Sequence, residues 1–72
     1  MSGLQGESTL SDDEKRSEAQ RHVTYLRQLT GLMAEYERKF VERLANDFDT
    51  YGNRVNISNK QLFWLRDLVV KY

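Results

Sequence analysis

Residues 33–51 read MAEYERKFVERLANDFDTY, and this stretch decides the fold. Its large apolar and aromatic side chains recur at steps of three or four: Met33, Tyr36, Phe40, Leu44, Phe48 and Tyr51. That spacing places them on one face of an α-helix, whereas a half-buried strand would alternate at every second residue. Glu35 and Lys39 stand four residues apart and are expected to pair on the outer face. The stretch therefore predicts an amphipathic helix, which Gly52 ends because glycine adopts a positive φ at low cost.

A helix upstream of this stretch is predicted by its start signal. Ser11 and Glu14 form a capping box, in which the hydroxyl accepts from one free amide and the carboxylate from another. The stripe that follows is Ala19, Val23, Leu26, either Leu29 or Thr30, and Met33. Thr30 is a good helix cap, and Gly31 costs about 1 kcal/mol inside a helix. Either the chain breaks here and a new helix starts at Thr30, or one long helix continues through a weak point; folding back buries more apolar surface, so we favour the break.

The last part of the chain predicts a third helix. Ser58 and Gln61 form a second capping box, and Ile57 is placed to pack on Leu62. The apolar residues that share one arc of this helix are Leu62, Leu65, Leu68, Val69 and Tyr72. We expect this arc to pack on the stripe of residues 33–51.

Composition restricts the class of protein. The 72 residues carry 11 basic and 11 acidic side chains, so the whole molecule has no net attraction to nucleic acid or anionic membranes. There is no cysteine and one histidine, which argues against disulfides and metal sites. The chain has neither a long apolar run nor a secretory start, so we expect a cytoplasmic protein.

The prediction is an all-α, three-helix domain over residues 11–72, preceded by a flexible tail over residues 1–10.

Residues that resemble catalytic or metal sites are few. His22 and Glu18 have the spacing of a general base and its orienting carboxylate, but no nucleophile is placed beside them, which favours a histidine at the helix boundary. Asp47, Asp49 and Asn53 supply oxygen ligands without the register of a calcium-binding loop. Phosphate-binding and hydrolase motifs are absent from the sequence. We expect no cofactor, no metal and no enzymatic activity.

Phe63 and Val70 raise the question of a binding surface. They lie seven residues apart on the third helix, about 150° from the centre of its apolar arc, while Trp64 falls at the margin of that arc and can lean inward. One alternative is that the first helix covers both side chains. The other is that they stay exposed and anchor a protein partner, with Arg66 and Lys71 matching its charges. The same face is also a candidate for homo-oligomerisation.

A second candidate surface is basic. Arg38, Lys39 and Arg43 are expected to form a patch on the second helix that suits an acidic partner. Together with Arg54 and Lys60 they are also suited to phosphates, so a small nucleic-acid-binding module is the alternative function.

Several residues between positions 36 and 72 form a recognisable set: Glu37, Phe40, Ser58, Lys60, Gln61 and the closing Lys71 and Tyr72. With them, this segment resembles one that recurs in small phage-encoded proteins and at the ends of phage replication proteins. The resemblance implies a phage origin and a role in handling host machinery. Small phage regulators that bind bacterial RNA polymerase are similar in size and lack catalytic motifs. The function expected from the resemblance is therefore a non-catalytic regulator that binds a host protein, RNA polymerase first among them, and modulates transcription.

Overall fold

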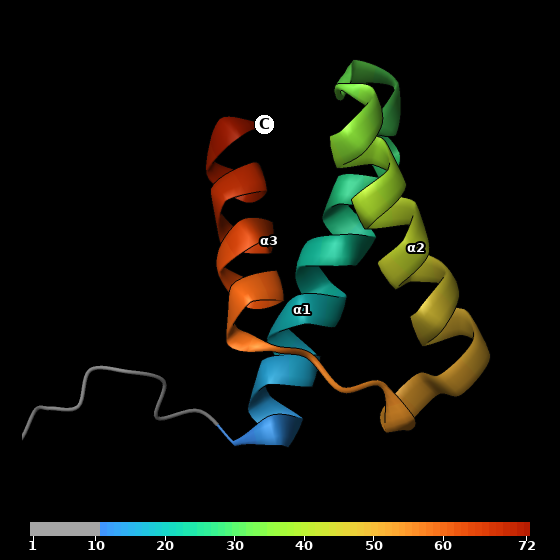
Figure 1. Ribbon diagram of the computed structural model, residues 1–72, viewed down its shortest axis with the longest axis vertical. Coiled ribbons are helices and arrows are strands. Elements are labelled where there is room, and N and C mark those ends of the chain that lie inside the picture. The colour runs from blue at the N-terminus through green and yellow to red at the C-terminus, as the bar shows by residue number, and fades with distance from the viewer. Residues whose placement is uncertain (1–10) are drawn as a thin grey trace, which may run out of the picture.

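The computed structural model describes residues 11–72 as helices joined by short connections (Figure 1). The elements are α1 (Asp12–Leu26), the 3-10 helix η2 (Arg27–Leu32), α2 (Glu35–Tyr51), the 3-10 helix η3 (Gly52–Arg54) and α3 (Asn59–Lys71). The prediction of an all-α fold with three helices is confirmed, and no strand forms within residues 11–72. The tail expected over residues 1–10 lies outside the described residues.

Helix α1 is the central element. Helix α2 runs back along it, and α3 runs in the same direction as α1, so that α3 ends near the start of α2 (Figure 1). Helix α3 packs principally on α1, and α2 packs on α1 and on η2. Polar contacts join the start of α1 to the start of α3 and to the connection before it: Lys15 Nζ donates to Asn59 Oδ1 at 3.2 Å, and Arg16 Nη1 donates to the Val55 carbonyl at 3.3 Å. The expected packing of the third helix mainly on the second is therefore wrong.

The apolar core forms where the three helices face one another. Its buried members are Ala19, Val23, Leu26, Met33, Val41, Leu44, Ala45, Phe48, Val55, Ile57, Leu62, Leu65 and Leu68. Ile57 and Leu62 are both among them, as the arrangement around the second capping box predicts.

The junction after α1 differs from its prediction. The break is present, but the second helix does not start at Thr30, whose hydroxyl donates to the Arg27 carbonyl at 3.3 Å. The chain continues as η2, and α2 begins at Glu35 with Ala34 as its N-cap. Alanine has no side-chain oxygen to accept from the Glu37 amide, so only half of a capping box forms: the Ala34 amide donates to the Glu37 carboxylate at 3.1 Å.

The buried face of α2 is rotated from the predicted stripe. Tyr36 and Tyr51, which the stripe includes, are 63% and 59% exposed, and Phe40 is half-buried. The face that the structure buries consists of Glu37, Val41, Leu44, Ala45 and Phe48. The rotation agrees with the central place of α1: Val41, Leu44 and Ala45 are buried, whereas Tyr36 and Phe40 stack on Trp64 of α3.

The local signals at the helix ends are confirmed. In the first capping box Ser11 N donates to Glu14 Oε1 at 2.9 Å and Glu14 N to Ser11 Oγ at 3.2 Å. The second box joins Ser58 and Gln61 in the same way, at 3.0 and 3.1 Å. Gly52 follows α2 with a φ of 57°, which favours glycine.

Candidate functional site

The outer face of α3, which we define as Phe63, Arg66, Asp67 and Val70, is the first candidate surface. Phe63 is 51% exposed and Val70 is 88% exposed, so α1 does not cover them. Seven residues of helix separate them by about 10 Å along the axis. Of the two alternatives that the sequence leaves open, the structure shows the exposed one.

Arg66 is held in place within this face. Its Nε donates to Glu18 Oε2 at 2.7 Å and its Nη2 to Glu18 Oε1 at 2.9 Å, and its guanidinium carbon lies 5.7 Å from the centroid of the Phe63 ring. His22 Nε2 is 2.9 Å from the same Glu18 Oε2. Arg66 was expected to match a charge of the partner, but Glu18 already balances the positive charge of Arg66 within the molecule.

The bidentate contact with Arg66, with a further contribution from His22, lowers the pKa of Glu18 to about 2. Since the pKa of the carboxylate is lower in the folded chain, its contribution to stability is full above about pH 4.5 and is lost as the pH falls toward 2. We expect Glu18→Gln to remove about 1 kcal/mol of this acid-sensitive stability, a modest value because the Arg66 side chain is 43% exposed. Urea unfolding of both proteins across this pH range measures it.

Glu42→Gln is the control, because Glu42 is exposed and makes no ion pair within residues 11–72. It should keep the pH slope of the unchanged protein. Equal slopes in the Glu18 and Glu42 variants would contradict the assignment of the acid response to the Glu18–Arg66 pair.

Lys71 is also bound within the molecule. Its Nζ donates to Glu37 Oε2 at 2.7 Å, and the Tyr72 hydroxyl donates to Glu37 Oε1 at 2.5 Å. Glu37 is only 2% exposed, and the hydrogen bonds from Lys71 and Tyr72 lower its pKa. The end of α3 is thus fastened to the first turn of α2, and Lys71 is not free to match a partner's charge as predicted.

The burial of Glu37 is not predicted from the sequence. The signal that pointed to it was its position four residues before Val41, on the face that also carries Leu44 and Phe48. A carboxylate on such a face must have partners to be buried. These partners come from a different helix, so the local pattern does not name them.

A stack of aromatic rings joins α2 to α3. The centroids of Phe40 and Trp64 lie 3.9 Å apart and those of Tyr36 and Trp64 lie 6.3 Å apart, with an interplanar angle of 22° in each pair. Trp64 therefore leans inward, as its position at the margin of the apolar arc predicts, while its neighbour Phe63 points to the outer face. The two adjacent rings thus serve different surfaces of the same helix.

The basic patch predicted on α2 is divided. Lys39 pairs with Glu35 at 3.2 Å, which confirms that expected pair and balances the lysine charge. Arg38 and Arg43 are exposed and make no ion pair in the described part of the chain. Five residues of helix separate them by about 140° around the axis, so they do not share one face.

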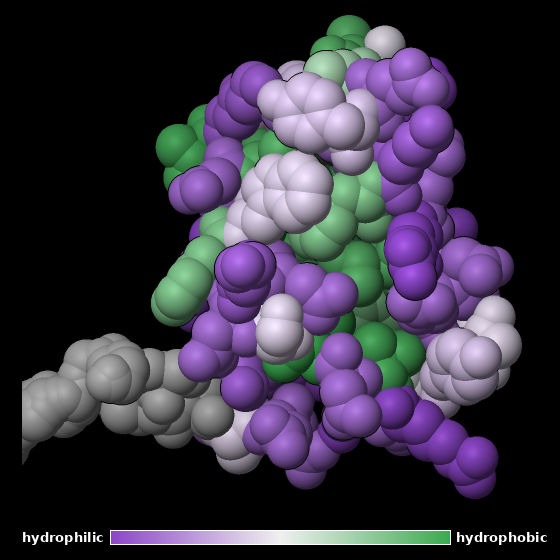
Figure 2. Space-filling view, in the orientation of Figure 1, coloured by the Kyte–Doolittle hydropathy of each residue, from purple (hydrophilic) through white to green (hydrophobic). Residues whose placement is uncertain are grey.

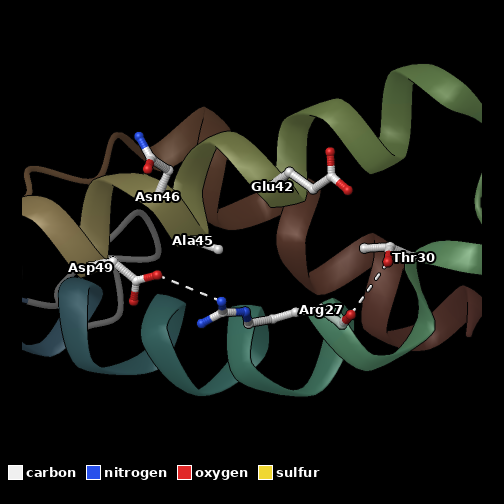
Figure 3. A pocket seen from close by; sticks show the side chains of 6 residues that line it. All are labelled: Arg27, Thr30, Glu42, Ala45, Asn46 and Asp49. Atoms are coloured by element: carbon white, nitrogen blue, oxygen red, sulfur yellow. Dashed lines mark hydrogen bonds and ion pairs between the residues drawn. The ribbon is translucent and has the colours of Figure 1, made fainter.

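A shallow pocket of about 370 Å³ lies between η2 and α2 (Figure 3). It is lined by Arg27, Thr30, Glu42, Ala45, Asn46 and Asp49. Arg27 and Asp49 point toward each other and pair at 3.6 Å, and the Thr30 hydroxyl is engaged with the Arg27 carbonyl (Figure 3). The lining contains no imidazole or thiol, and its one hydroxyl already donates a hydrogen bond, so the pocket offers no activated nucleophile.

Most residues that carry the phage resemblance have contacts within the molecule. Glu37 binds the closing Lys71 and Tyr72, Phe40 stacks on Trp64, and Ser58 and Gln61 cap α3. Among these residues Lys60 differs: it is exposed and makes no side-chain hydrogen bond or ion pair in the part of the chain that the structure describes. Glu37, Phe40, Lys71 and Tyr72 thus join α2 to α3, while Ser58 and Gln61 cap α3 itself.

Two further observations concern metals and membranes. Across residues 11–72 no group of three or more histidine, aspartate or glutamate side chains is arranged to hold a metal ion. Within the same range, each helix is too short or too polar to cross a membrane. Comparison of the chain with protein-family models, with curated proteins and with solved structures finds no match.

Proposed function

We propose that this protein is a non-catalytic binding protein that docks on another protein through the outer face of α3. The observation that carries the proposal is the simultaneous exposure of Phe63 and Val70 on one face of a helix whose opposite side is fully packed. An exposed aromatic ring beside an arginine is the usual content of an interface hot spot. The partner that the phage resemblance suggests is bacterial RNA polymerase in the host cytoplasm, with transcription as the process modulated.

The geometry defines what such a partner must offer. Burying the exposed parts of Phe63 and Val70 contributes about 2–4 kcal/mol, and Arg66 loses little further freedom because Glu18 already fixes it. Since the charge of Arg66 is balanced, the matching surface is apolar rather than strongly acidic. Asp67 is exposed and makes no ion pair within the described range, so a cation of the partner opposite Asp67 completes the match.

Docking through the outer face of α3 is tested by the double substitution Phe63→Ala, Val70→Ala. We expect its affinity for purified bacterial RNA polymerase to fall at least about tenfold, because both apolar anchors are lost. Its thermal unfolding should stay close to that of the unchanged protein, since both side chains are largely exposed. Biolayer interferometry with the immobilised protein measures the affinity.

Leu32→Ala is the matched control, because Leu32 is 71% exposed and lies on η2 instead of α3. Equal affinities of the double variant and the unchanged protein would contradict the docking face. Absence of polymerase binding by the unchanged protein would contradict the choice of partner. In that case, the proteins retained from bacterial lysate by the unchanged and double-variant proteins, identified by mass spectrometry, test the face alone.

The alternative function, a nucleic-acid-binding module, is less well supported. Arg43, Arg54 and Lys60 are exposed and make no ion pair within the described residues, but Arg38 lies on a different side of α2 from Arg43, and Lys39 is paired with Glu35.

A further inference from the structure

A hollow between α2 and α3 forms a surface separate from the outer face of α3. Figure 2 shows apolar atoms, in green, at the bottom of this hollow, with hydrophilic atoms along both sides. We call it the α2–α3 furrow and define it by Tyr36, Phe40, Arg43, Asp47 and Tyr51 of α2, Arg54 of η3, and Lys60 and Trp64 of α3. The α2 members follow one another at steps of three or four and therefore share one side of that helix.

The two ends of the furrow have different chemistry. At the end near the start of α2, the stacked rings of Tyr36, Trp64 and Phe40 offer an aromatic surface, of which Tyr36 is 63% exposed. At the other end lies a pocket of about 280 Å³, lined by Asp47, Tyr51, Arg54, Val55 and Asn56. The furrow thus has an aromatic surface at one end and a polar pocket at the other.

Unpaired positive charge lines the rim. Arg43, Arg54 and Lys60 are all exposed, and none of them makes an ion pair with a carboxylate of residues 11–72. By helical register, Arg43 lies beside Phe40, since it follows Phe40 by three positions, and Lys60 lies beside Trp64, since it precedes Trp64 by four positions. The acidic member of the furrow is Asp47, so the rim carries a local excess of positive charge in a chain of zero net charge.

We propose that the α2–α3 furrow binds an acidic amphipathic peptide segment of a partner protein. Apolar side chains of such a segment pack on the rings and on the apolar floor, while its carboxylates meet Arg43, Arg54 and Lys60. A nucleic acid fits less well, because Asp47 lies among the cations and the floor is apolar. A second copy of the furrow fits less well too, because it brings the same excess of positive charge.

The furrow is distinct from the outer face of α3. Trp64 lies on the side of α3 that turns toward α2, and Phe63 lies about 100° around the helix from it; Lys60 lies between them, about 60° from Phe63. Arg43 and Arg54 belong to α2 and η3, so the furrow can be altered at these residues without a change to the outer face of α3.

Selection of random peptides against the full chain provides the probe. We expect the selected sequences to be rich in glutamate or aspartate and in leucine or aromatic residues, and the tightest of them is then synthesised. Trp64 is the single tryptophan of the chain and lies in the furrow, so its fluorescence reports occupancy directly. The synthesised peptide should change Trp64 emission in a saturable way, and a version with its acids replaced by lysine should bind at least about tenfold more weakly.

The double charge reversal Arg43→Glu, Lys60→Glu should weaken the acidic peptide by at least about tenfold and leave the helical circular dichroism unchanged. Arg21→Glu is the matched control: Arg21 is an exposed cation of α1 that makes no ion pair within the described residues, and its reversal should not alter the affinity. Neutral or basic selected sequences, or an unaltered Trp64 emission, overturn the proposal. Equal losses in the Arg21 variant and the double variant overturn it as well, as does an oligo-dT strand that binds the furrow more tightly than the peptide.

Discussion

Leu65→Ala is expected to lower the free energy of unfolding by about 2–5 kcal/mol, because it empties a leucine-sized space in a packed core. Leu65 is 0% exposed and lies in the middle of α3, on the side that faces α1. A chain of 72 residues has a total stability of only roughly 4–11 kcal/mol, so this one change removes a large share of it. We expect the melting temperature to fall by more than about 10 °C in thermal unfolding followed by circular dichroism.

Val70→Ala provides the comparison on the same helix. Val70 is 88% exposed, so its truncation should change the free energy of unfolding by less than about 0.5 kcal/mol. Similar melting temperatures for the Leu65 and Val70 variants would show that α3 is not packed on its Leu65 side, which would contradict the fold described above.

The second large effect is expected at Glu37, where Glu37→Gln keeps the size of the side chain and removes its charge. The amide of glutamine presents a donor where the carboxylate accepts from Lys71 and Tyr72, so one of these contacts is lost and the positive charge of Lys71 has no counter-charge at this site. We expect the melting temperature to fall by roughly 5–10 °C. The last turn of α3 should fray, and hydrogen exchange of the Tyr72 amide, which donates to the Leu68 carbonyl at 2.9 Å, should accelerate.

The pH dependence of the Glu37 contact has a defined sign. Because folding lowers the pKa of Glu37, its contribution is full above the ordinary pKa of a glutamate and is lost as the pH falls below it. The unchanged protein and the Glu37→Gln variant should therefore become more alike in acid. Glu35→Gln is the control, since the Glu35–Lys39 pair is exposed on both sides and contributes little. Equal melting temperatures of the Glu37 and Glu35 variants at neutral pH would contradict the role of Glu37 as a fastening between α2 and α3.

Some helix ends are predicted correctly from the sequence and one is not. The capping boxes at Ser11 and Ser58 and the stop at Gly52 are found as expected, because each depends on residues a few positions apart. The predicted start of α2 is wrong because the Thr30 hydroxyl does not cap a helix. It donates instead to the Arg27 carbonyl within η2. Ala34 then takes the cap position, with no side-chain signal of its own.

The candidate surface was predictable in part. The exposure of Phe63 and Val70 is one of two alternatives that helical periodicity leaves open, and periodicity alone cannot choose between them. The ion pair between Arg66 and Glu18 was not predictable from spacing, because the two residues lie 48 positions apart in the chain. The same holds for Lys71 and Glu37, which are 34 positions apart.

The sequence by itself determined the three helices, most of their ends and the residues suited to a core, since these depend on contacts along one turn of the chain. Only the tertiary structure decided that α1 is central, that Glu37 is buried and that Arg66 and Lys71 are bound within the molecule. The physical reason is that the cost of burying a carboxylate or leaving a ring exposed depends on which helix lies opposite. That choice results from the packing of all three helices at once and is not encoded in any single stretch.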